Sequence, residues 1–194
     1  MCDCGACSEL VIGGILTTFE IRPAVASDLP RMMSIDHSSL SDYVWQLELR
    51  REASQVVASL REVRLPRSIE VRYPRNPSSL VDEWTRRDLV LVALHDGIPV
   101  GYLCAVEERA SAVAWVIDMV VAPSQRRKGA ASALLTATQT WASERSVHRL
   151  ILEMQSKNHG CIRLAQKFGY DFCGYNDQYY PTQDVALFFG RTIK

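Results

Sequence analysis

Residues 112–145 constrain the fold most, because they join a strand-like segment to a helix-like segment through a short basic turn. Residues 112–121 form a mostly apolar run that is typical of a buried strand, and Pro123 ends it. Small and apolar side chains then recur with helical spacing from Gly129 to Arg145, at Leu134, Leu135, Thr138, Trp141 and Ala142. A strand that leads into a helix in this way predicts a mixed α/β domain.

Strand signals lie on both sides of this segment. Upstream, residues 89–94 and 98–106 are apolar runs joined by His95-Asp96-Gly97, which predicts an antiparallel hairpin. Downstream, the pattern predicts a strand, a helix and two further strands, at residues 150–155, 158–168, 170–175 and 185–189. We therefore expect antiparallel hairpins that meet a strand-helix-strand unit.

The first third of the chain is less regular. Residues 18–22 alternate like a strand, and Ser27 is expected to cap a short helix that runs through Met33. We interpret residues 42–60 as a helix, and we expect a short strand over residues 68–73.

Composition and charge limit the domain count and the partners. The chain has 194 residues, 47% of them hydrophobic, so we expect one domain at residues 18–194 after an N-terminal extension, residues 1–17, of unknown role. Basic and acidic residues number 22 each, which gives no electrostatic case for a nucleic acid or a membrane as partner. The apolar stretch of residues 10–19 is too short to span a bilayer and lacks the positive flank of a secretory signal, so a cytoplasmic location is expected.

The six cysteines predict neither a metal site nor a disulfide framework. Only Cys2, Cys4 and Cys7 are clustered, and three thiols without a nearby fourth ligand make an incomplete tetrahedral site. Cys104 lies in an apolar, strand-like run, where a buried reduced thiol is ordinary.

The basic turn has the features of a phosphate site. Backbone N–H groups at a helix start, together with the positive end of the helix dipole, attract anions, and small residues let a phosphate approach the main chain. The residues expected to bind phosphate are Arg126, Arg127, Lys128, Gly129, Ala130 and Ala131. A basic turn also occurs at ordinary strand-to-helix corners, so the turn by itself leaves both interpretations open.

Residues 126–131 resemble the acetyl-CoA signature of the GNAT superfamily of N-acetyltransferases, Gln/Arg-x-x-Gly-x-Gly/Ala. A second match follows, because Leu150-Ile-Leu-Glu-Met-Gln155, Asn158 and the Cys161–Tyr170 segment resemble the next strand and helix of that family and the Gly-aromatic end of this helix. The two matches have the family's order and separation. The resemblance covers residues 87–190, about the C-terminal half of the chain.

The resemblance implies an enzyme that moves an acetyl group from acetyl-CoA to a primary amine by direct attack on the thioester. It implies a mixed, mostly antiparallel sheet flanked by helices, in which strands 112–121 and 150–155 splay apart and admit the pantetheine arm. Main-chain groups near Met119 and Val121 would then bond this arm and polarise the thioester carbonyl, and Asn158 would contact the arm, cap its helix, or do both. Acetyl-CoA is the expected cosubstrate, without a metal.

Acetyl transfer needs a group that accepts a proton, because only a neutral amine attacks a thioester carbon. Glu153 is the candidate base, since it stands in an otherwise apolar strand and matches the glutamate of ribosomal-protein alanine N-acetyltransferases, the RimI-type members. Asp118, an acid within an apolar run, is the alternative. Either side chain can instead face solvent at a strand edge.

Position 165 departs from the family pattern. Many GNAT enzymes carry a tyrosine there as the acid for the leaving thiolate, whereas this chain has Ala165. A free thiol has a pKa of about 8.5, so the leaving group needs less protonation than an alkoxide would. Tyr180 is the candidate replacement, ahead of Tyr175 and Tyr179.

The sequence is compatible with two classes of acceptor amine. The Tyr-Tyr-Pro sequence at Tyr180 resembles RimI-type enzymes, which act on peptide amino termini, and Asp177-x-x-Tyr180 resembles streptothricin acetyltransferases, which act on a small antibiotic. The resemblance to the family also implies that a homodimer is possible. The absence of a tyrosine at position 165 suggests an alternative function, a non-catalytic regulatory module that binds acyl-CoA. Residues 50–87 contain nine arginines against five acidic residues, which we interpret as a solvated face with ion pairs.

Overall fold

The computed structural model describes residues 19–194, which form two compact units. The first unit contains residues 19–37, 77–150 and 192–194, and the second contains residues 38–76 and 151–191. The predicted N-terminal extension and its clustered cysteines lie outside the described residues.

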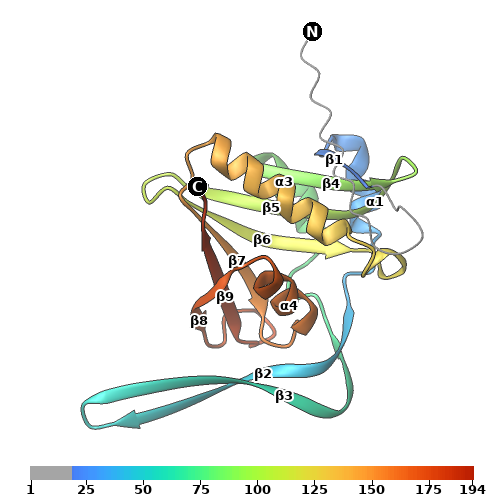
Figure 1. Ribbon diagram of the computed structural model, residues 1–194. Helices are drawn as coiled ribbons and strands as arrows, with labels where there is room; N and C mark the ends of the chain where they lie inside the picture. Colours follow the sequence, from blue (N-terminus) through green and yellow to red (C-terminus); the bar gives the residue numbers. More distant parts are fainter. Residues whose placement is uncertain (1–18) are drawn as a thin grey trace. The chain divides into compact units, whose positions relative to one another are not determined.

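Four strands form the sheet of the first unit: β1 (Glu20–Pro23), β4 (Leu89–His95), β5 (Ile98–Glu108) and β6 (Val113–Val121). They lie in the order β1-β4-β5-β6, and each neighbouring pair is antiparallel. The hairpin predicted between residues 89 and 106 is therefore confirmed. Helix α3 (Ala130–Glu144) contacts all four strands (Figure 1).

The core of the first unit lies between this sheet and its helices. β4 is buried from Leu89 to Leu94 because it is an inner strand, paired with β1 on one edge and β5 on the other. Leu134 and Leu135 of α3 are also fully buried. Burial of one such side chain stabilises the folded chain by about 1.5–3 kcal/mol. Short helices complete the unit: η1 (Ala26–Asp28), α1 (Leu29–Met33), α2 (Ser79–Glu83), η2 (Trp84–Arg86) and η3 (Pro123–Gln125).

The start of the first helical segment is capped by a carboxylate. Asp28 accepts the backbone N–H of Val25 at 2.8 Å and two hydrogen bonds from the Arg22 guanidinium, at 2.7 and 2.9 Å. The bonds from Arg22 lower the pKa of Asp28. The prediction that Ser27 caps this helix was wrong, because Ser27 lies inside η1 and Asp28 is the residue that precedes α1.

The second unit combines a long two-stranded ribbon with three strands and a helix. The ribbon is formed by β2 (Ser39–Glu52) and β3 (Gln55–Val71), which are antiparallel. The other strands, in the order β7-β9-β8, are β7 (Arg149–Gln155), β9 (Ala186–Thr192) and β8 (Asp171–Asn176), and the helix is α4 (His159–Lys167). Strands β8 and β9 pair antiparallel.

The helix expected over residues 42–60 was wrong, because this segment forms β2, a turn at residues 53–54 and the start of β3. The end of the ribbon that contains Tyr43 and Trp45 is bonded to and packed on the rest of its unit. The backbone N–H of Trp45 donates to the Ser156 carbonyl at 2.9 Å. The Tyr43 ring stacks on His159 with ring centroids 4.8 Å apart. The mixed α/β fold with a mostly antiparallel sheet and flanking helices is confirmed in both units.

Candidate active site

The basic turn lies where the sequence predicts it, between β6 and α3 in the first unit. Gly129 precedes α3 with a φ of +107°, a conformation that L side chains rarely adopt, and no side chain caps the helix. The first N–H groups of an α-helix have no acceptor within the helix. A Cβ built on Gly129 meets no atom within 4 Å, so this face of the turn is open.

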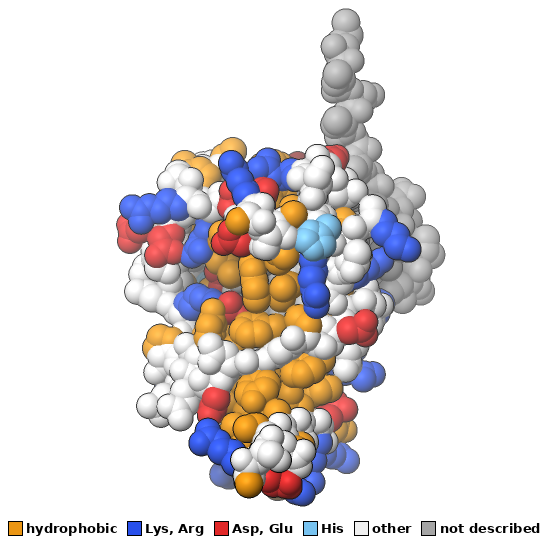
Figure 2. Space-filling view, turned by 90° about the vertical axis from the view of Figure 1, so that its left-hand side faces the viewer, with side chains coloured by type: hydrophobic (Ala, Val, Ile, Leu, Met, Phe, Trp, Pro, Cys, Tyr) orange, Lys and Arg blue, Asp and Glu red, His pale blue; other side chains and the backbone are white. Residues whose placement is uncertain are grey.

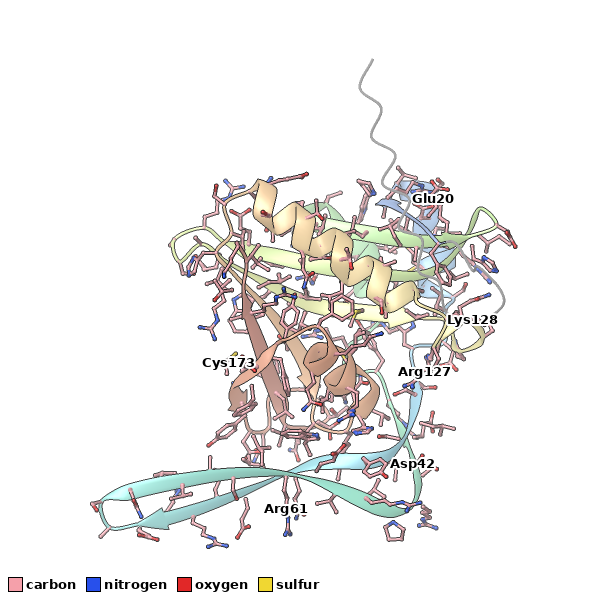
Figure 3. All side chains as sticks on the ribbon, in the orientation of Figure 1. Glu20, Asp42, Arg61, Arg127, Lys128 and Cys173 are labelled. Carbon is pink, nitrogen blue, oxygen red and sulfur yellow. The ribbon has the colours of Figure 1, made fainter. Side chains whose placement is uncertain are left out.

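The three basic side chains of the turn differ in their surroundings. Arg126 turns back onto the protein, with Nε 2.8 Å from the Val121 carbonyl and Nη2 3.1 Å from the Asp36 carbonyl. Arg127 and Lys128 are exposed at the N-terminal end of α3 (Figure 3). Arg126 thus fixes the conformation of the turn, while Arg127 and Lys128 supply accessible positive charge.

This arrangement fits a pyrophosphate. The turn has an uncapped helix start, a glycine with open space beside it and two exposed cations, which are the features that an anion site needs. Ala130 and Ala131 add no bulk at the first helical positions, and Ala130 is buried beneath the turn. The same residues therefore suit the diphosphate of coenzyme A.

Strand β6 places Asp118 and Met119 on opposite faces, because successive side chains of a strand alternate. Asp118 is 8% exposed on the buried face, and Met119 and Val121 are half-buried on the other. The pairing with β5 shifts register next to Asp118, so β6 carries a bulge there. A bulge changes the direction of the adjacent N–H and carbonyl groups.

A histidine that the sequence analysis did not identify lies near Asp118. His37 Nδ1 is 2.5 Å from the Ile35 carbonyl, so this nitrogen carries the proton, and Nε2 accepts the Tyr102 hydroxyl at 2.8 Å. Burial lowers the pKa of His37, against an opposing effect of the Ile35 carbonyl and of the Asp118 charge. His37 is therefore neutral near pH 7. The loop before β2 offered no local pattern that marks this residue.

In the second unit, Glu153 lies at the centre of a polar cluster. Its side chain is 3% exposed on β7, its Oε1 is ion-paired with Arg75, and its Oε2 accepts the Tyr179 hydroxyl at 3.1 Å. A carboxylate can accept about four hydrogen bonds, so these partners leave acceptor capacity for a further donor. Glu153 does not point to solvent at a strand edge.

Tyr180 belongs to the same cluster. The Arg75 guanidinium lies over its ring, 5.3 Å from the centroid, and Tyr179 packs edge-on against it with centroids 5.0 Å apart. Burial raises the pKa of Tyr180 far above that of free tyrosine, and the nearby Glu153 charge adds to this effect. The pKa of Tyr179 is raised for the same two reasons. Both phenols stay protonated at neutral pH.

Arg75 is the member of the cluster that the sequence analysis missed. It was one of nine arginines in the run interpreted as a solvated face, and nothing in its local sequence sets it apart. Its partner lies 78 positions away in the sequence, so the pairing depends on the tertiary fold.

Helix α4 holds the remaining candidates. Asn158 caps it, with the side-chain oxygen accepting the Cys161 N–H at 3.1 Å, so the capping role is confirmed. Ala165 is fully buried, and burial raises the pKa of the Cys161 thiol to about 12. Neither residue offers a proton donor of suitable strength.

No group of three or more potential metal ligands occurs among residues 19–194. Over the same residues, no helix combines the length and apolarity needed to cross a membrane.

The chain matches the model of one protein family. The description of this family is "Acetyltransferase (GNAT) family", and residues 57–170 match it. No curated protein sequence matches the chain.

Several solved structures share the fold. Nourseothricin acetyltransferase has a TM-score of 0.76 at 23% identity, with 91% of this chain and 99% of the other covered. A putative streptothricin acetyltransferase from Bacillus anthracis str. Ames, in complex with acetyl coenzyme A, has a TM-score of 0.69 at 20% identity, with 90% and 99% covered. The ribosomal-protein-S18-alanine N-acetyltransferase from Escherichia coli has a TM-score of 0.64 at 18% identity, with 91% and 94% covered.

Proposed function

The chain belongs to the acetyltransferase (GNAT) family, and from this premise we propose that it acetylates a primary amine by direct attack of the amine on acetyl-CoA. The observation that carries the proposal is the open, uncapped start of α3 behind Gly129. It is the feature expected of a coenzyme A site, and the family match includes it.

We assign the cofactor diphosphate to the turn before α3. Backbone N–H groups from Gly129 to Ala131 are proposed to hold its oxygens, with Arg127 and Lys128 as counter-charges. Arg126 keeps the turn in shape through its bonds to two carbonyls. Main-chain groups of β6 near Met119 and Val121 are proposed to bond the pantetheine arm.

When bound, acetyl-CoA supplies an acetyl group whose carbon–sulfur bond is exchanged for a carbon–nitrogen bond to the amine. Glu153 is the proposed proton acceptor for the incoming ammonium, directly or through one water. The Arg75 ion pair supports this role, because the guanidinium holds the buried carboxylate in a fixed orientation.

Tyr180 is proposed to act as a hydrogen-bond donor and not as a strong acid. Its raised pKa keeps the proton on Oη throughout the working pH range. Full transfer to a thiolate of pKa about 8.5 would be unfavourable for the same reason. Asn158 is proposed to contact the pantetheine arm with its amide nitrogen, because its oxygen is used as the helix cap.

We propose a cationic amine as the acceptor, either an amino antibiotic or a peptide amino terminus. The proposal rests on Glu153 and Tyr179, because the carboxylate keeps acceptor capacity for an ammonium and the Tyr179 ring beside it is 42% exposed. The likeness to nourseothricin acetyltransferase and to the ribosomal-protein enzyme supports including both kinds of amine in a test.

Amine-dependent release of free thiol from acetyl-CoA tests this function. The amines are a streptothricin, an aminoglycoside, a polyamine and a peptide with a free amino terminus, each product being identified by mass spectrometry. We expect acetylation of at least one amine at a rate above the background hydrolysis. Coenzyme A binding by calorimetry without turnover of any amine would instead indicate an acyl-CoA-binding module.

A further inference from the structure

Strand β2 has one edge that no other strand pairs with. Within the described part of the chain, its sheet has two strands, so β3 pairs with one edge of β2 and leaves the other edge free. A free edge presents a row of N–H and C=O groups to any extended chain that reaches it. Proteins often protect such an edge with a proline or a bulge, and β2 has neither between Tyr43 and Glu52.

One backbone hydrogen bond shows which groups of β2 face the free edge. The backbone N–H of Trp45 donates to the Ser156 carbonyl at 2.9 Å, so the N–H and C=O of Trp45 point away from β3. This direction alternates along an antiparallel strand, and no register shift interrupts the pairing of β2 with β3 beyond Tyr43. Leu47 and Leu49 therefore also turn their N–H and C=O groups toward the free edge.

A groove of about 410 Å³ lies along this edge, and we call it the β2 groove. Its lining includes Leu47 and Leu49 of β2, and Ser156, Asp177 and Val185 from segments of the same unit outside the ribbon. Ser156 is the residue already bonded to the edge, so a chain in the groove can continue the pairing that Ser156 begins. The volume is in the range of sites that hold a small ligand or a short segment of chain.

The charge that the β2 groove offers to an occupant is negative. Lys157 also lines the groove, but it is already ion-paired with Asp184. Asp177 is exposed and makes no ion pair among residues 19–194. A basic side chain in the groove is therefore favoured over an acidic one.

The surface beside the groove also suits the side chains of an added strand. Figure 2 views the molecule from the side on which the tip of the ribbon lies in Figure 1, and apolar side chains are exposed where this view shows the ribbon and the strands of its unit. Leu49 of β2 is 37% exposed. Every second side chain of an added strand would pack on this apolar surface.

The β2 groove is close to the polar cluster of Glu153. Ser156 follows Glu153 by three positions, which is at most about 10 Å of extended chain. Asp177 comes two positions before Tyr179, whose hydroxyl donates to the Glu153 carboxylate. An acceptor whose amine lies at Glu153 can therefore place its next few residues in the groove.

We propose that an extended, basic peptide binds in the β2 groove as a third strand on the free edge of β2, with its amino terminus at the Trp45 end. Its backbone bonds the N–H and C=O groups of Leu47 and Leu49, and a basic side chain lies beside Asp177. The role of the peptide amino terminus rests on the proposed acetylation, because this end lies toward Glu153. A small amino antibiotic has no backbone to pair, so the acceptor class is a polypeptide.

Backbone methylation of a peptide tests the pairing. The probe is a lysine-containing peptide of about eight residues with a free amino terminus, which spans roughly 26 Å when extended, and each version carries one N-methyl group. Alternate N–H groups of a strand face its neighbour, so beyond the first few residues we expect KM to rise roughly threefold to tenfold at every second position, with kcat little changed. The amide of the N-terminal dipeptide does not reach the groove, and its KM should be higher by roughly tenfold or more.

Leu47→Pro tests the same edge from the side of the protein. It removes an N–H that faces the groove and not β3, so the ribbon keeps its pairing. We expect KM for the long peptide to rise roughly threefold to tenfold and KM for the dipeptide to stay the same. Leu60→Pro is the matched control, because Leu60 lies directly opposite Leu47 and its N–H faces the far edge of β3. Its KM is expected within about twofold of the wild type, and circular dichroism shows whether each variant is folded.

Asp177→Asn tests the charge of the groove. We expect it to raise KM for the lysine-containing peptide roughly threefold or more, and to leave KM unchanged or lower for a peptide with glutamate in place of lysine. Asp171→Asn is the control, because Asp171 is an exposed carboxylate on β8 in the same unit and does not line the groove. Equal effects of the two substitutions would remove Asp177 from the site.

Calorimetry with the same peptides in the presence of coenzyme A separates this inference from the proposed function, because it needs no turnover. If no amine is acetylated but peptide affinity alternates with the methylated position, the pairing stands and the acetylation proposal fails. If amines are acetylated but neither KM nor affinity alternates, the pairing is overturned and the acetylation proposal stands. The pairing is also overturned if the dipeptide and the long peptide have the same KM, or if only the small amines are acetylated and the long peptide does not bind.

Discussion

We expect turnover to depend most on Glu153, because its carboxylate is the proposed proton acceptor. Glu153→Gln keeps the side-chain shape but removes the proton acceptor, so we expect kcat/KM to fall by about 10²-fold or more at neutral pH. The loss should shrink at high pH, where the amine substrate is neutral without help. A pH–rate series on both proteins measures this.

Asp118→Asn is the control for the Glu153 prediction. Asp118 is also a strand carboxylate, 8% exposed, but it belongs to the first unit, where it lies next to His37 and Cys104. Its substitution is expected to lower kcat/KM by less than about tenfold. If Asp118→Asn were the more severe variant, the base would have to be assigned to the first unit.

The raised pKa values of the two tyrosines beside Glu153 lead us to expect that the folded chain loses stability at alkaline pH. Unfolded tyrosine ionises near pH 10.0, while burial raises the pKa of Tyr180 and Tyr179 in the folded chain. Above pH 10 the unfolded chain loses these protons first, so stability is retained below that pH and falls as the pH rises further. Each phenol contributes a slope of at most about 1.4 kcal/mol per pH unit.

Urea unfolding between pH 8 and pH 11 checks this behaviour. Tyr180→Phe is expected to flatten the alkaline decline more than Tyr179→Phe, because Tyr180 is 4% exposed and Tyr179 is 42% exposed. Tyr175→Phe serves as the comparison outside the cluster. Equal declines in all four proteins would show that the two phenols ionise normally in the folded state.

Residue-level reasoning from the sequence finds a candidate where a side chain conflicts with its local pattern, and the catalytic role of that candidate stays a prediction. Glu153 was identified because a carboxylate interrupts an apolar strand, and the structure gives it buried partners. Arg75 and His37 were missed because their partners come from distant segments, Glu153 and Tyr102. No local spacing encodes such a pair, since it exists only after the chain has folded.

At the scale of elements, the turn before α3 makes a prediction of its own. Gly129→Glu puts a side chain and a negative charge where the diphosphate is proposed to bind, so we expect coenzyme A affinity to fall by about 10²-fold or more. Isothermal titration calorimetry with coenzyme A measures the loss.

Gly97→Glu is the matched control for backbone strain. Gly97 and Gly129 both have positive φ, +73° and +107°, and a Cβ at either position meets no atom within 4 Å. Both substitutions should cost about 1–2 kcal/mol of stability, but only that at Gly129 should affect binding. Unchanged affinity in folded Gly129→Glu would remove the main support for the coenzyme A site.

Elements with one clear period were predicted well, and the ribbon was not. The strand, basic turn and helix around residues 112–145 follow from alternation, Pro123 and helical spacing, and they match β6 and α3 closely. Residues 42–60 carry charged and apolar side chains that suit either period. The turn between the two strands is Ala53-Ser54, which lacks the glycine or asparagine that is typical of a two-residue hairpin loop. The sequence therefore gives no local signal that predicts this turn.

For the whole molecule, the family and the general fold were predictable because two motifs occur in the right order and separation. The division of the described chain into two compact units was not, since each unit is built from segments far apart in the sequence. The acceptor amine is not encoded by either motif. We expect the choice of amine to depend on side chains such as Arg75 and Tyr180, which lie together only in the folded second unit.

Binding of coenzyme A should raise the stability of the unit that contains α3. Of the four tryptophans, Trp84, Trp115 and Trp141 lie in this unit and Trp45 lies in the other, so a Trp45→Phe variant reports unfolding of the first unit by fluorescence. A ligand that binds only the folded state at 100 times its Kd stabilises that state by about 2.7 kcal/mol.

For a unit of this size, that energy corresponds to a rise of roughly 10–20 °C in the unfolding midpoint. The rise should depend on the logarithm of the coenzyme A concentration above Kd, and adding Gly129→Glu to the Trp45→Phe variant should abolish it. Adenosine alone is the ligand control, because it lacks the diphosphate that the turn before α3 is proposed to hold. An equal rise with adenosine, or a rise that survives Gly129→Glu, would place the binding energy outside this turn.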